Sequence, residues 1–307
     1  MSTILVATEK PFAKQAVDGI KDIVEKSGNT FKLLENYTDK QQLLDAVADA
    51  DAIIIRSDKV TDEVMAAGKN LKIVVRAGAG YDNVDLEAAT KRGIVVMNTP
   101  GQNSNAVAEL VFGMLVFAVR NFYNGKSGTE LKGKKLGILA FGQVGRNVAR
   151  IAKGFGMDIY AYDAFCPANV IEEAGVHAVA NQSELFKNCD IVSLHIPATA
   201  ETKQSINYAM CSQMKKGAIL VNTARKEVIN EAELIKLMEE RTDLKYVTDI
   251  APDANEEFKS KFEGRYFATP KKMGAQTAEA NINAGLAAAN QIVDFFKTGN
   301  KKFQVNK

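Results

Sequence analysis

The feature that most constrains this chain is a glycine turn between an apolar strand and a helix, followed by a second strand that ends in an acid. The stretch Leu136-Gly-Ile-Leu-Ala-Phe-Gly-Gln-Val-Gly145 fits a strand, a turn and the first turn of a helix. This is the G-x-G-x-x-G arrangement of dinucleotide-binding folds, with Ala140 in the first glycine position. Gly142 lets the backbone approach a pyrophosphate, and Gly145 lets helix and strand pack closely. Backbone donors of the helix start, Gln143 and Val144 among them, would bind the phosphates.

The second strand identifies the dinucleotide. It runs over Asp158–Tyr162 and leads into Asp163, which lies 23 positions after Ala140. An acid at this distance binds the ribose diol and repels the additional phosphate of NADP, so the sequence predicts NAD as cofactor. A plain glycine turn with an ordinary strand-end acid is the alternative, and the strand–turn–helix–strand context argues against it. The methyl group of Ala140 is expected to tighten the turn and weaken NAD binding.

The rest of the chain alternates between β-branched runs and segments with helical spacing. This alternation predicts an α/β protein with two doubly wound parallel sheets. Before residue 100 the strand-like runs are Ile4–Ala7, Ala52–Ile55, Ile73–Val75 and Gly93–Met97, and after residue 136 they are Ile159–Tyr162, Ile191–His195, Ile219–Asn222 and Tyr246–Asp249. The longest expected helices are Pro11–Lys26, Asn105–Arg120 and Ala278–Lys297.

Charge and cysteine content exclude several classes of protein. A net charge of +2 spread over 307 residues gives no reason to expect a nucleic-acid or membrane partner. Three widely spaced cysteines form neither a disulfide framework nor a zinc motif, so we expect a cytoplasmic protein without a metal. The N-terminus does not have the pattern of a signal peptide. The apolar run Ala106–Val119 is too short to span a bilayer and contains Glu109, so it is expected to be a buried helix.

Several further motifs, in register along the chain, resemble the D-2-hydroxyacid dehydrogenases. They are Val75-Arg-Ala-Gly-Ala-Gly-Tyr-Asp-Asn-Val-Asp85, Val96-Met-Asn-Thr-Pro100, Asn103-Ser104, Ala108-Glu109, His195-Ile-Pro197, Val221-Asn-Thr-Ala-Arg225, Val247-Thr-Asp249 and Met273-Gly-Ala275. Within that family the match is nearest to the D-3-phosphoglycerate dehydrogenases. The resemblance therefore implies NAD-dependent oxidation of D-3-phosphoglycerate to 3-phosphohydroxypyruvate, the first step of serine biosynthesis.

The resemblance also implies a domain organisation. A Rossmann-type NAD-binding domain, residues 101–277, would be inserted into a discontinuous flavodoxin-like substrate-binding domain, residues 1–100 and 278–307. The active site would lie in the cleft between the two domains. No regulatory domain is expected after the last helix, and the apolar face of residues 105–120 suggests a homodimer, although that face could equally belong to the core.

The family's functional residues transfer to matching positions here. Arg225 would grip the substrate carboxylate and the reacting oxygen, because a planar guanidinium binds a carboxylate through two hydrogen bonds. Asp249 would contact the nicotinamide amide. His195 would line the cofactor site, or could equally be a structural histidine, and it is not expected to transfer protons. The remaining cofactor positions are Pro197, Thr223, Ala224 and Gly274.

The substrate is expected to carry a phosphate because cations follow two adjacent strands. Arg56, Ser57 and Lys59 come after one strand, and Arg76 precedes the loop Gly78-Ala79-Gly80, whose amides could bind an oxyanion. Each cation alone could be an ordinary surface charge, whereas together they favour a phosphorylated hydroxy acid. Asn103 is expected at the same site.

The chain departs from the family pattern at the general acid/base. The family has a histidine after Thr-Pro, paired with a glutamate, but this chain reads Thr269-Pro-Lys-Lys-Met-Gly-Ala-Gln-Thr277. The downstream match puts Lys272 in the histidine position, and counting from the proline would put Lys271 there. Ala254 occupies the glutamate position, next to Asp253. A carboxylate would hinder a lysine base by favouring its charged form, so the two losses are consistent with each other.

Two alternatives remain open at this stage. The first is a hydroxypyruvate or glyoxylate reductase of the same family, against which the cations at positions 56 and 76 argue. The second is a non-catalytic NAD-sensing protein, which the loss of the histidine–glutamate pair favours and the retention of Arg225 and Asp249 opposes.

Overall fold

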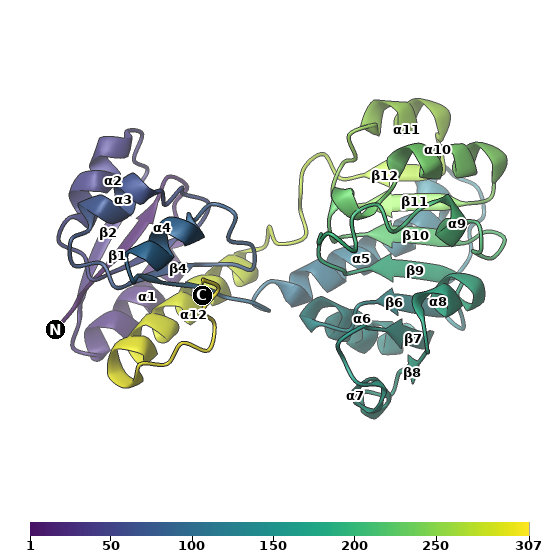
Figure 1. The fold of residues 1–307 in the computed structure, drawn as a ribbon. Coiled ribbons are helices and arrows are strands. Elements are labelled where there is room, and N and C mark those ends of the chain that lie inside the picture. The colour runs from purple at the N-terminus through teal and green to yellow at the C-terminus, as the bar shows by residue number, and fades with distance from the viewer. Residues whose placement is uncertain (307) are drawn as a thin grey trace. The chain divides into compact units, whose positions relative to one another are not determined.

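The computed structural model describes residues 1–306 and divides them into two compact units. The first unit comprises residues 1–103 together with the segment from residue 277 onward, and the second comprises residues 104–276 (Figure 1). Within residues 1–306, no helix combines the length and apolarity needed to cross a membrane. The same residues contain no group of three or more His, Cys, Asp or Glu side chains that could hold a metal ion.

The first unit contains a five-stranded parallel sheet. Its spatial order is β2-β1-β3-β4-β5, which is the flavodoxin-like order. The strands are β1 Thr3–Thr8, β2 Thr30–Glu35, β3 Ala52–Ile55, β4 Ile73–Arg76 and β5 Val95–Asn98.

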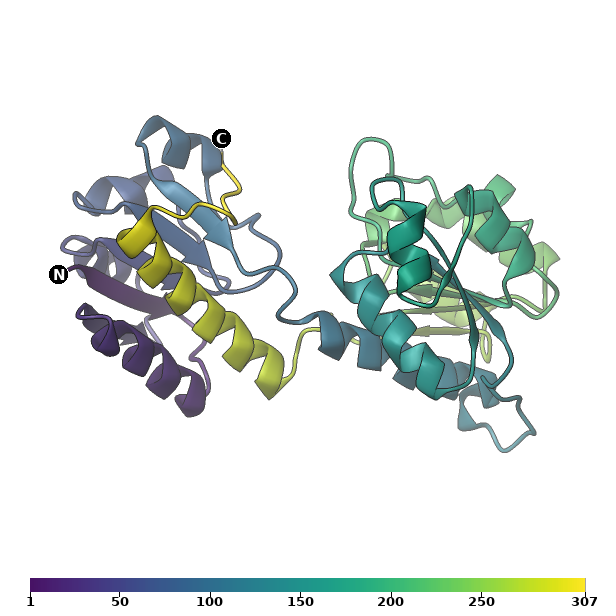
Figure 2. The same ribbon diagram turned by 90° about the horizontal axis from the view of Figure 1, so that it is seen from below.

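Both faces of this sheet are covered, which explains why its central strands are continuous apolar runs. In β1, Leu5 and Ala7 point into one core cluster while Ile4 and Val6 point into the other. The first face is covered by α2 Lys40–Val47, α3 Asp62–Ala67 and α4 Leu86–Lys91, and the second by α1 Lys14–Lys26 and α12 Ala278–Thr298. Figure 2 shows α1 and α12 side by side on that second face.

The second unit contains a seven-stranded parallel sheet with the order β12-β11-β10-β9-β6-β7-β8. Counted within this unit, the order is 3-2-1-4-5-6 of the dinucleotide-binding fold with one strand added. The strands are β6 Lys135–Leu139, β7 Asp158–Tyr162, β8 His177–Ala178, β9 Ile191–Leu194, β10 Ile219–Asn222, β11 Lys245–Thr248 and β12 Tyr266–Ala268.

Helices cover both faces of this sheet as well (Figure 1). One face carries α5 Ser104–Val119, α6 Gln143–Gly154 and α7 Ala168–Glu173, with the short helix η1 Asn121–Tyr123 after α5. The other face carries α8 Gln182–Asn188, α9 Tyr208–Cys211, η2 Lys226–Val228, α10 Glu231–Glu240 and α11 Asn255–Lys261. The two parallel sheets confirm the predicted fold class.

Three strands have no clear signal in the sequence, and each lies at the edge of a sheet. These strands are β2, β8 and β12. An edge strand has a neighbour on one side only, so it needs less apolar side chain. No residue of β2 is fully buried, and β8 has only two residues.

The segment after α12 closes the other edge of the first sheet. Val305 N donates to Val96 O at 2.9 Å, and the buried Asn306 side chain continues the contact. Its Oδ1 accepts from Val96 N at 2.8 Å and its Nδ2 donates to Ile94 O at 2.9 Å. Strand β5 therefore does not present an open edge to other chains.

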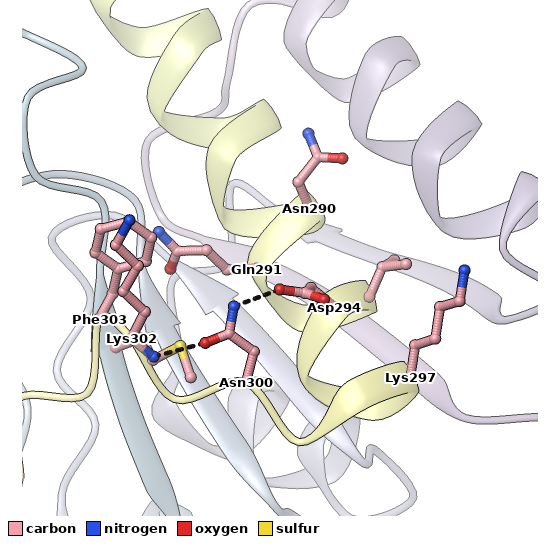
Figure 3. A pocket seen from close by; sticks show the side chains of 9 residues that line it. Asn290, Gln291, Asp294, Lys297, Asn300, Lys302 and Phe303 are labelled. Carbon is pink, nitrogen blue, oxygen red and sulfur yellow. Dashed lines mark hydrogen bonds between the residues drawn. The ribbon is translucent and has the colours of Figure 1, made fainter.

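A surface groove of about 420 Å³ lies between the second half of α12 and this C-terminal segment. Figure 3 shows Asn300, whose Nδ2 donates to Asp294 at 2.6 Å and whose Oδ1 accepts from Lys302 N at 2.9 Å. None of the residues predicted to act on NAD or substrate lines the groove.

We expect Asn306→Ala to lower the free energy of unfolding by about 1–3 kcal/mol, because the backbone groups Val96 N and Ile94 O would lose their partner. Urea denaturation measures the change. Asn290→Ala, on the exposed side of α12, is the matched control and should stay within about 0.5 kcal/mol of the parent. Equal midpoints for both variants would contradict this role of Asn306.

Candidate active site

The candidate residues of the second unit gather at the carboxyl edge of its sheet. All seven strands run parallel, so the segments that follow them meet at this edge. The strand order reverses between β6 and β9, and ligands of doubly wound sheets bind at such a point. Ala140 follows β6, Asp163 follows β7, His195 follows β9, Thr223–Arg225 follow β10 and Asp249 follows β11.

The glycine turn has the geometry of a phosphate site. Gly142 is the N-cap residue of α6 and offers no side-chain cap, so side chains do not occupy the first amides of the helix. A Cβ on Gly142 would meet nothing within 4 Å, which leaves room for a ligand at the backbone. A Cβ on Gly145 would lie 2.3 Å from Ala140 O, so this position requires glycine for close packing. These features fit a pyrophosphate at the start of α6.

Ala140 adopts a backbone conformation that favours glycine. Its φ is +81°, in the left-handed region, while its N–H donates to Tyr162 O at 2.8 Å. An L-residue in this region carries strain of roughly 1–2 kcal/mol. The alanine is therefore accommodated in the turn at the expense of backbone strain.

Asp163 joins the glycine turn to the loop after β7. Its Oδ2 accepts from Phe141 N at 2.7 Å, and its Oδ1 accepts from Phe165 N at 2.7 Å and from Cys166 N at 2.9 Å. The carboxylate is thus fixed beside the turn, where a ribose would follow the pyrophosphate.

His195 is held by two neighbouring hydroxyl groups. Ser193 Oγ lies 2.9 Å from Nε2, and Thr223 Oγ1 lies 3.4 Å from Nδ1. Burial lowers the pKa of His195 to about 3, so the ring is neutral at physiological pH. That His195 takes no part in proton transfer stays a prediction. Pro197, two residues on, is exposed.

Arg225 lies in a loop that is organised by Asn222, a fully buried residue at the end of β10. Asn222 Oδ1 accepts from Ala224 N at 2.9 Å, and its Nδ2 donates to Arg225 O at 2.9 Å. The half-buried Arg225 side chain donates from Nη1 to Ala224 O at 2.9 Å. The loop backbone is therefore fixed at the edge where the sequence places substrate binding.

Asp249 holds the segment that contains the two lysines. Its buried carboxylate accepts from Thr269 Oγ1 at 2.9 Å, from Met273 N at 2.7 Å and from Gly274 N at 2.8 Å. A Cβ on Gly274 would lie 2.9 Å from Oδ2, so the close approach depends on glycine. Lys271 and Lys272, both exposed, lie between these contacts.

Ala254, where the resemblance would place a glutamate, and its neighbour Asp253 are also held by other residues. Ala254 N donates to Glu231 Oε2 at 2.8 Å, and the Asp253 carboxylate forms an ion pair with Lys226. Asp253 was the nearest acid that could replace the glutamate, and the structure gives it a lysine of another loop as its partner.

In the first unit, the candidate cations differ in how they are used. Arg56 donates to Lys10 O at 3.1 Å, to Pro11 O at 3.0 Å and to Asn281 Oδ1 at 2.8 Å, so much of its guanidinium serves the fold. Burial lowers the pKa of Arg56. Ser57 and Lys59 are exposed beside it.

Arg76 packs directly over the glycine loop. A Cβ on Gly78 would lie 1.6 Å from Arg76 Nη1, and the φ of Gly78 is +147°. Ala79 O accepts from Asn98 Nδ2 at 2.6 Å, which ties this loop, ending at Gly80, to the end of β5. The Arg76 side chain is therefore packed against the backbone of the glycine loop. Asn103 is the last residue of the first segment of this unit.

Sequence reasoning missed the residues that support these loops. Asp58 is one: its buried carboxylate accepts from Glu9 N at 2.7 Å, Tyr37 OH at 2.9 Å and Arg56 N at 3.1 Å. Asn222 and Glu231 act similarly in the second unit. Most of their partners are backbone groups, which any residue offers, so these contacts leave no residue pattern in the sequence.

Comparison with known proteins adds a family to this geometry. Residues 118–265 match the family model described as D-isomer specific 2-hydroxyacid dehydrogenase, NAD binding domain. A crystal structure of NAD+-bound 3-phosphoglycerate dehydrogenase from Entamoeba histolytica is 50% identical and aligns with a TM-score of 0.86, covering 100% of this chain and 99% of that chain.

Two curated relatives have different activities. A D-3-phosphoglycerate dehydrogenase from Methanocaldococcus jannaschii is 38% identical over 82% of this chain and 51% of its own length. A hydroxypyruvate reductase from Thermotoga maritima is 35% identical over 95% of this chain and 98% of its own length. The chain thus spans about half the length of the first relative and nearly all of the second.

Ala140→Gly should raise the free energy of unfolding by about 1 kcal/mol, because glycine adopts a positive φ without steric strain. Urea denaturation measures the gain. Ala178→Gly, in β8, is the control and should lose stability, because glycine weakens a strand. A loss of stability in Ala140→Gly would contradict the strain inferred from the φ of this residue.

The ring of His195 should remain neutral from pH 8 to pH 5, because its pKa lies near 3. The unfolded chain takes up this proton near pH 6.5, so the contribution of His195 to stability is complete above pH 6.5 and is lost as the pH falls toward 3. NMR of the protein labelled with ¹⁵N-histidine measures the protonation of the ring. In His177→Asn the only remaining histidine signal is that of His195. A midpoint near 6.5 for His195 would refute this assignment.

Proposed function

The chain belongs to the D-isomer specific 2-hydroxyacid dehydrogenases, and on that basis we propose that it oxidises D-3-phosphoglycerate to 3-phosphohydroxypyruvate, the first step of serine biosynthesis. The observation that carries the proposal is the similarity to a 3-phosphoglycerate dehydrogenase. The two chains are 50% identical, and the match covers 100% of this chain and 99% of the other. Arg76, which packs over the glycine loop, and the exposed Lys59 in the segment after β3 support a substrate that carries a phosphate.

NAD is the cofactor of this family, and residues 118–265 match its NAD-binding domain. Bound NAD supplies the acceptor for the hydride that leaves C2 of the hydroxy acid. We propose that the backbone of Gly142–Gly145 binds the pyrophosphate and that Asp163 binds the adenosine ribose. His195, Pro197, Thr223, Ala224, Asp249 and Gly274 are the proposed lining of the remaining cofactor surface.

Two cations of the second unit would carry the chemistry. Arg225 would bind the substrate carboxylate and polarise the C2 oxygen. Lys272 would take the proton of the C2 hydroxyl as the C–H bond breaks and the carbonyl forms, and it would return this proton in the reverse reaction. Asp249 would keep the lysine segment in place through the three hydrogen bonds to Thr269, Met273 and Gly274. Lys271 is the alternative base.

The substrate phosphate would be bound by residues of the first unit. Arg76, Ser57 and Lys59 are the proposed contacts, together with the backbone of Gly78–Gly80 and with Asn103. Arg56 would contribute less than a free arginine, because its Nη atoms already bind carbonyl groups and Asn281.

A second candidate function is hydroxypyruvate reduction. It is favoured by the relative from Thermotoga maritima, which this chain matches over 98% of that protein's length. This reaction uses the same carboxylate contact and the same proton transfer in the opposite direction, but needs no phosphate site. A non-catalytic NAD-sensing protein would need neither Arg225 nor a base.

We also propose that the protein is a homodimer in the cytoplasm. Helix α5 is apolar on its core side and also carries Ala106, Leu110, Gly113 and Phe117 along its more exposed side, where a second copy could pack. Cys166, Cys189 and Cys211 form no disulfide among residues 1–306, which suits a reducing compartment.

The test is absorbance at the NADH band with a panel of hydroxy acids. We expect turnover with D-3-phosphoglycerate and NAD, and kcat/KM at least about tenfold lower for D-glycerate, because it lacks the phosphate contacts. Lys272→Met should lower kcat by about 100-fold or more, whereas Lys271→Met should change it by only a few-fold.

Other outcomes assign other functions. Faster turnover of hydroxypyruvate with NADH than of the phosphorylated substrate would favour the reductase. NAD binding without turnover of any substrate would favour the sensor. If Lys271→Met rather than Lys272→Met abolishes turnover, Lys271 is the base.

A further inference from the structure

An ion pair connects the two loops that follow β10 and β11, and the proposed reaction does not account for it. Lys226 comes directly after Arg225 and begins η2, while Asp253 lies in the loop before α11. The Lys226 ammonium hydrogen-bonds the Asp253 carboxylate, which raises the pKa of Lys226. The pair therefore connects the loop of Arg225 to the loop that follows the neighbouring strand.

Glu231 makes a second connection between the same loops. It is the first residue of α10, and its carboxylate accepts from Asp253 N at 3.0 Å through Oε1 and from Ala254 N at 2.8 Å through Oε2. Hydrogen bonds to a charged carboxylate are stronger than those between neutral groups. Two residues that follow Arg225, Lys226 and Glu231, thus bind one short stretch of the other loop.

Asn222 fixes the chain on the opposite side of Arg225. Through its contacts with Ala224 N and Arg225 O, the backbone is held immediately before and at the arginine. Arg225 itself is extended, with φ −145° and ψ 144°. The arginine is therefore held between a buried amide on one side and an ion pair on the other.

The ion pair is too exposed to contribute much to overall stability. The Lys226 side chain is 35% exposed and the Asp253 side chain 79%, and solvent screens such pairs strongly. A function of this pair is therefore to be sought in the two loops that it joins. One of these loops contains Arg225. The other contains Asp253 itself, which is next to Ala254, the position of the family's glutamate.

We propose that the Lys226–Asp253 ion pair is a positioning element for Arg225, which orients the arginine toward the substrate carboxylate. Asp253 then acts through Lys226 and does not replace the family's glutamate as the partner of the base. This inference rests on the proposed function, because it assumes that Arg225 binds a hydroxy acid. A displacement of a binding group by about 1 Å can lower the rate about 100-fold, so a weak pair can have a large kinetic effect.

The test compares Lys226→Met, Asp253→Asn, the double variant and the conservative Lys226→Arg. Lys261→Met is the matched control, because Lys261 is also an exposed lysine with acidic partners, Glu239 and Glu257. The measurements are KM for D-3-phosphoglycerate, KM for NAD, kcat and its pH profile. Hydrogen exchange of residues 223–231 and 250–255 follows the loops without requiring turnover.

We expect each single variant to raise KM for the hydroxy acid by about 5- to 20-fold and the double variant by no more than either, because one contact is lost in all three. Lys226→Arg and Lys261→Met should resemble the parent. KM for NAD and the pH profile should not change, and amides of both loops should exchange faster in the single variants.

Two results would overturn the proposal. A lower kcat and a shifted pH profile in Asp253→Asn alone would make Asp253 the partner of the base. Unchanged KM and unchanged exchange in both loops would mean that the pair positions nothing. If the parent turns over no hydroxy acid, the proposed function fails, and the exchange data still show whether the pair couples the loops.

Discussion

A parallel sheet places the carboxyl end of every strand at the same edge, and the candidate site of the second unit depends on this constraint. Residues as far apart in sequence as Ala140, Arg225 and Asp249 meet at this edge because strands β6, β10 and β11 run in the same direction. The helices on both faces favour apolar side chains within the strands, with buried exceptions such as Ser193 and Asn222, so most of the polar candidate residues follow the strands. The candidate site residues of the second unit are therefore concentrated in the segments just after the strands.

Those segments are irregular, and each is held by a buried or half-buried polar side chain. Asn222 binds the backbone at Ala224 and Arg225, Asp163 binds three amides, and Asp249 binds two amides and a hydroxyl. Asp58 has the same function in the first unit. A reactive side chain can be presented with a defined geometry only when its loop has such an internal support.

The sequence predicted those parts of the fold that depend on local patterns. Buried strands such as β3 and β10 match their predicted bounds, because they are apolar on both sides. The edge strands β2, β8 and β12 were missed, because half-exposed residues resemble loops. The glycine turn was recognised from its spacing, whereas the φ of Ala140 could be seen only in three dimensions.

The position of the candidate residues at the sheet edge was predictable where they come soon after strands, as Asp163 and Arg225 do. The role of Glu231 was not, because its partners, Asp253 N and Ala254 N, are backbone groups that any residue would offer. The structural hydrogen bonds of Arg56 could not be predicted either, since they go to the backbone carbonyl groups of Lys10 and Pro11. Contacts to the backbone depend on tertiary structure, and a residue pattern does not encode them.

The discontinuity of the first unit has a consequence for the order in which the chain can fold during synthesis. Residues 104–276 are contiguous and contain all seven strands of their sheet, so the second unit can complete its core as soon as they leave the ribosome. The first unit cannot complete its core until the end of the chain is synthesised, because α12 covers one face of its sheet and the segment around Asn306 pairs with β5. Until then, the apolar residues of β3 and β4 that face α12 lack their cover, so the half of the protein that is synthesised first becomes stable last.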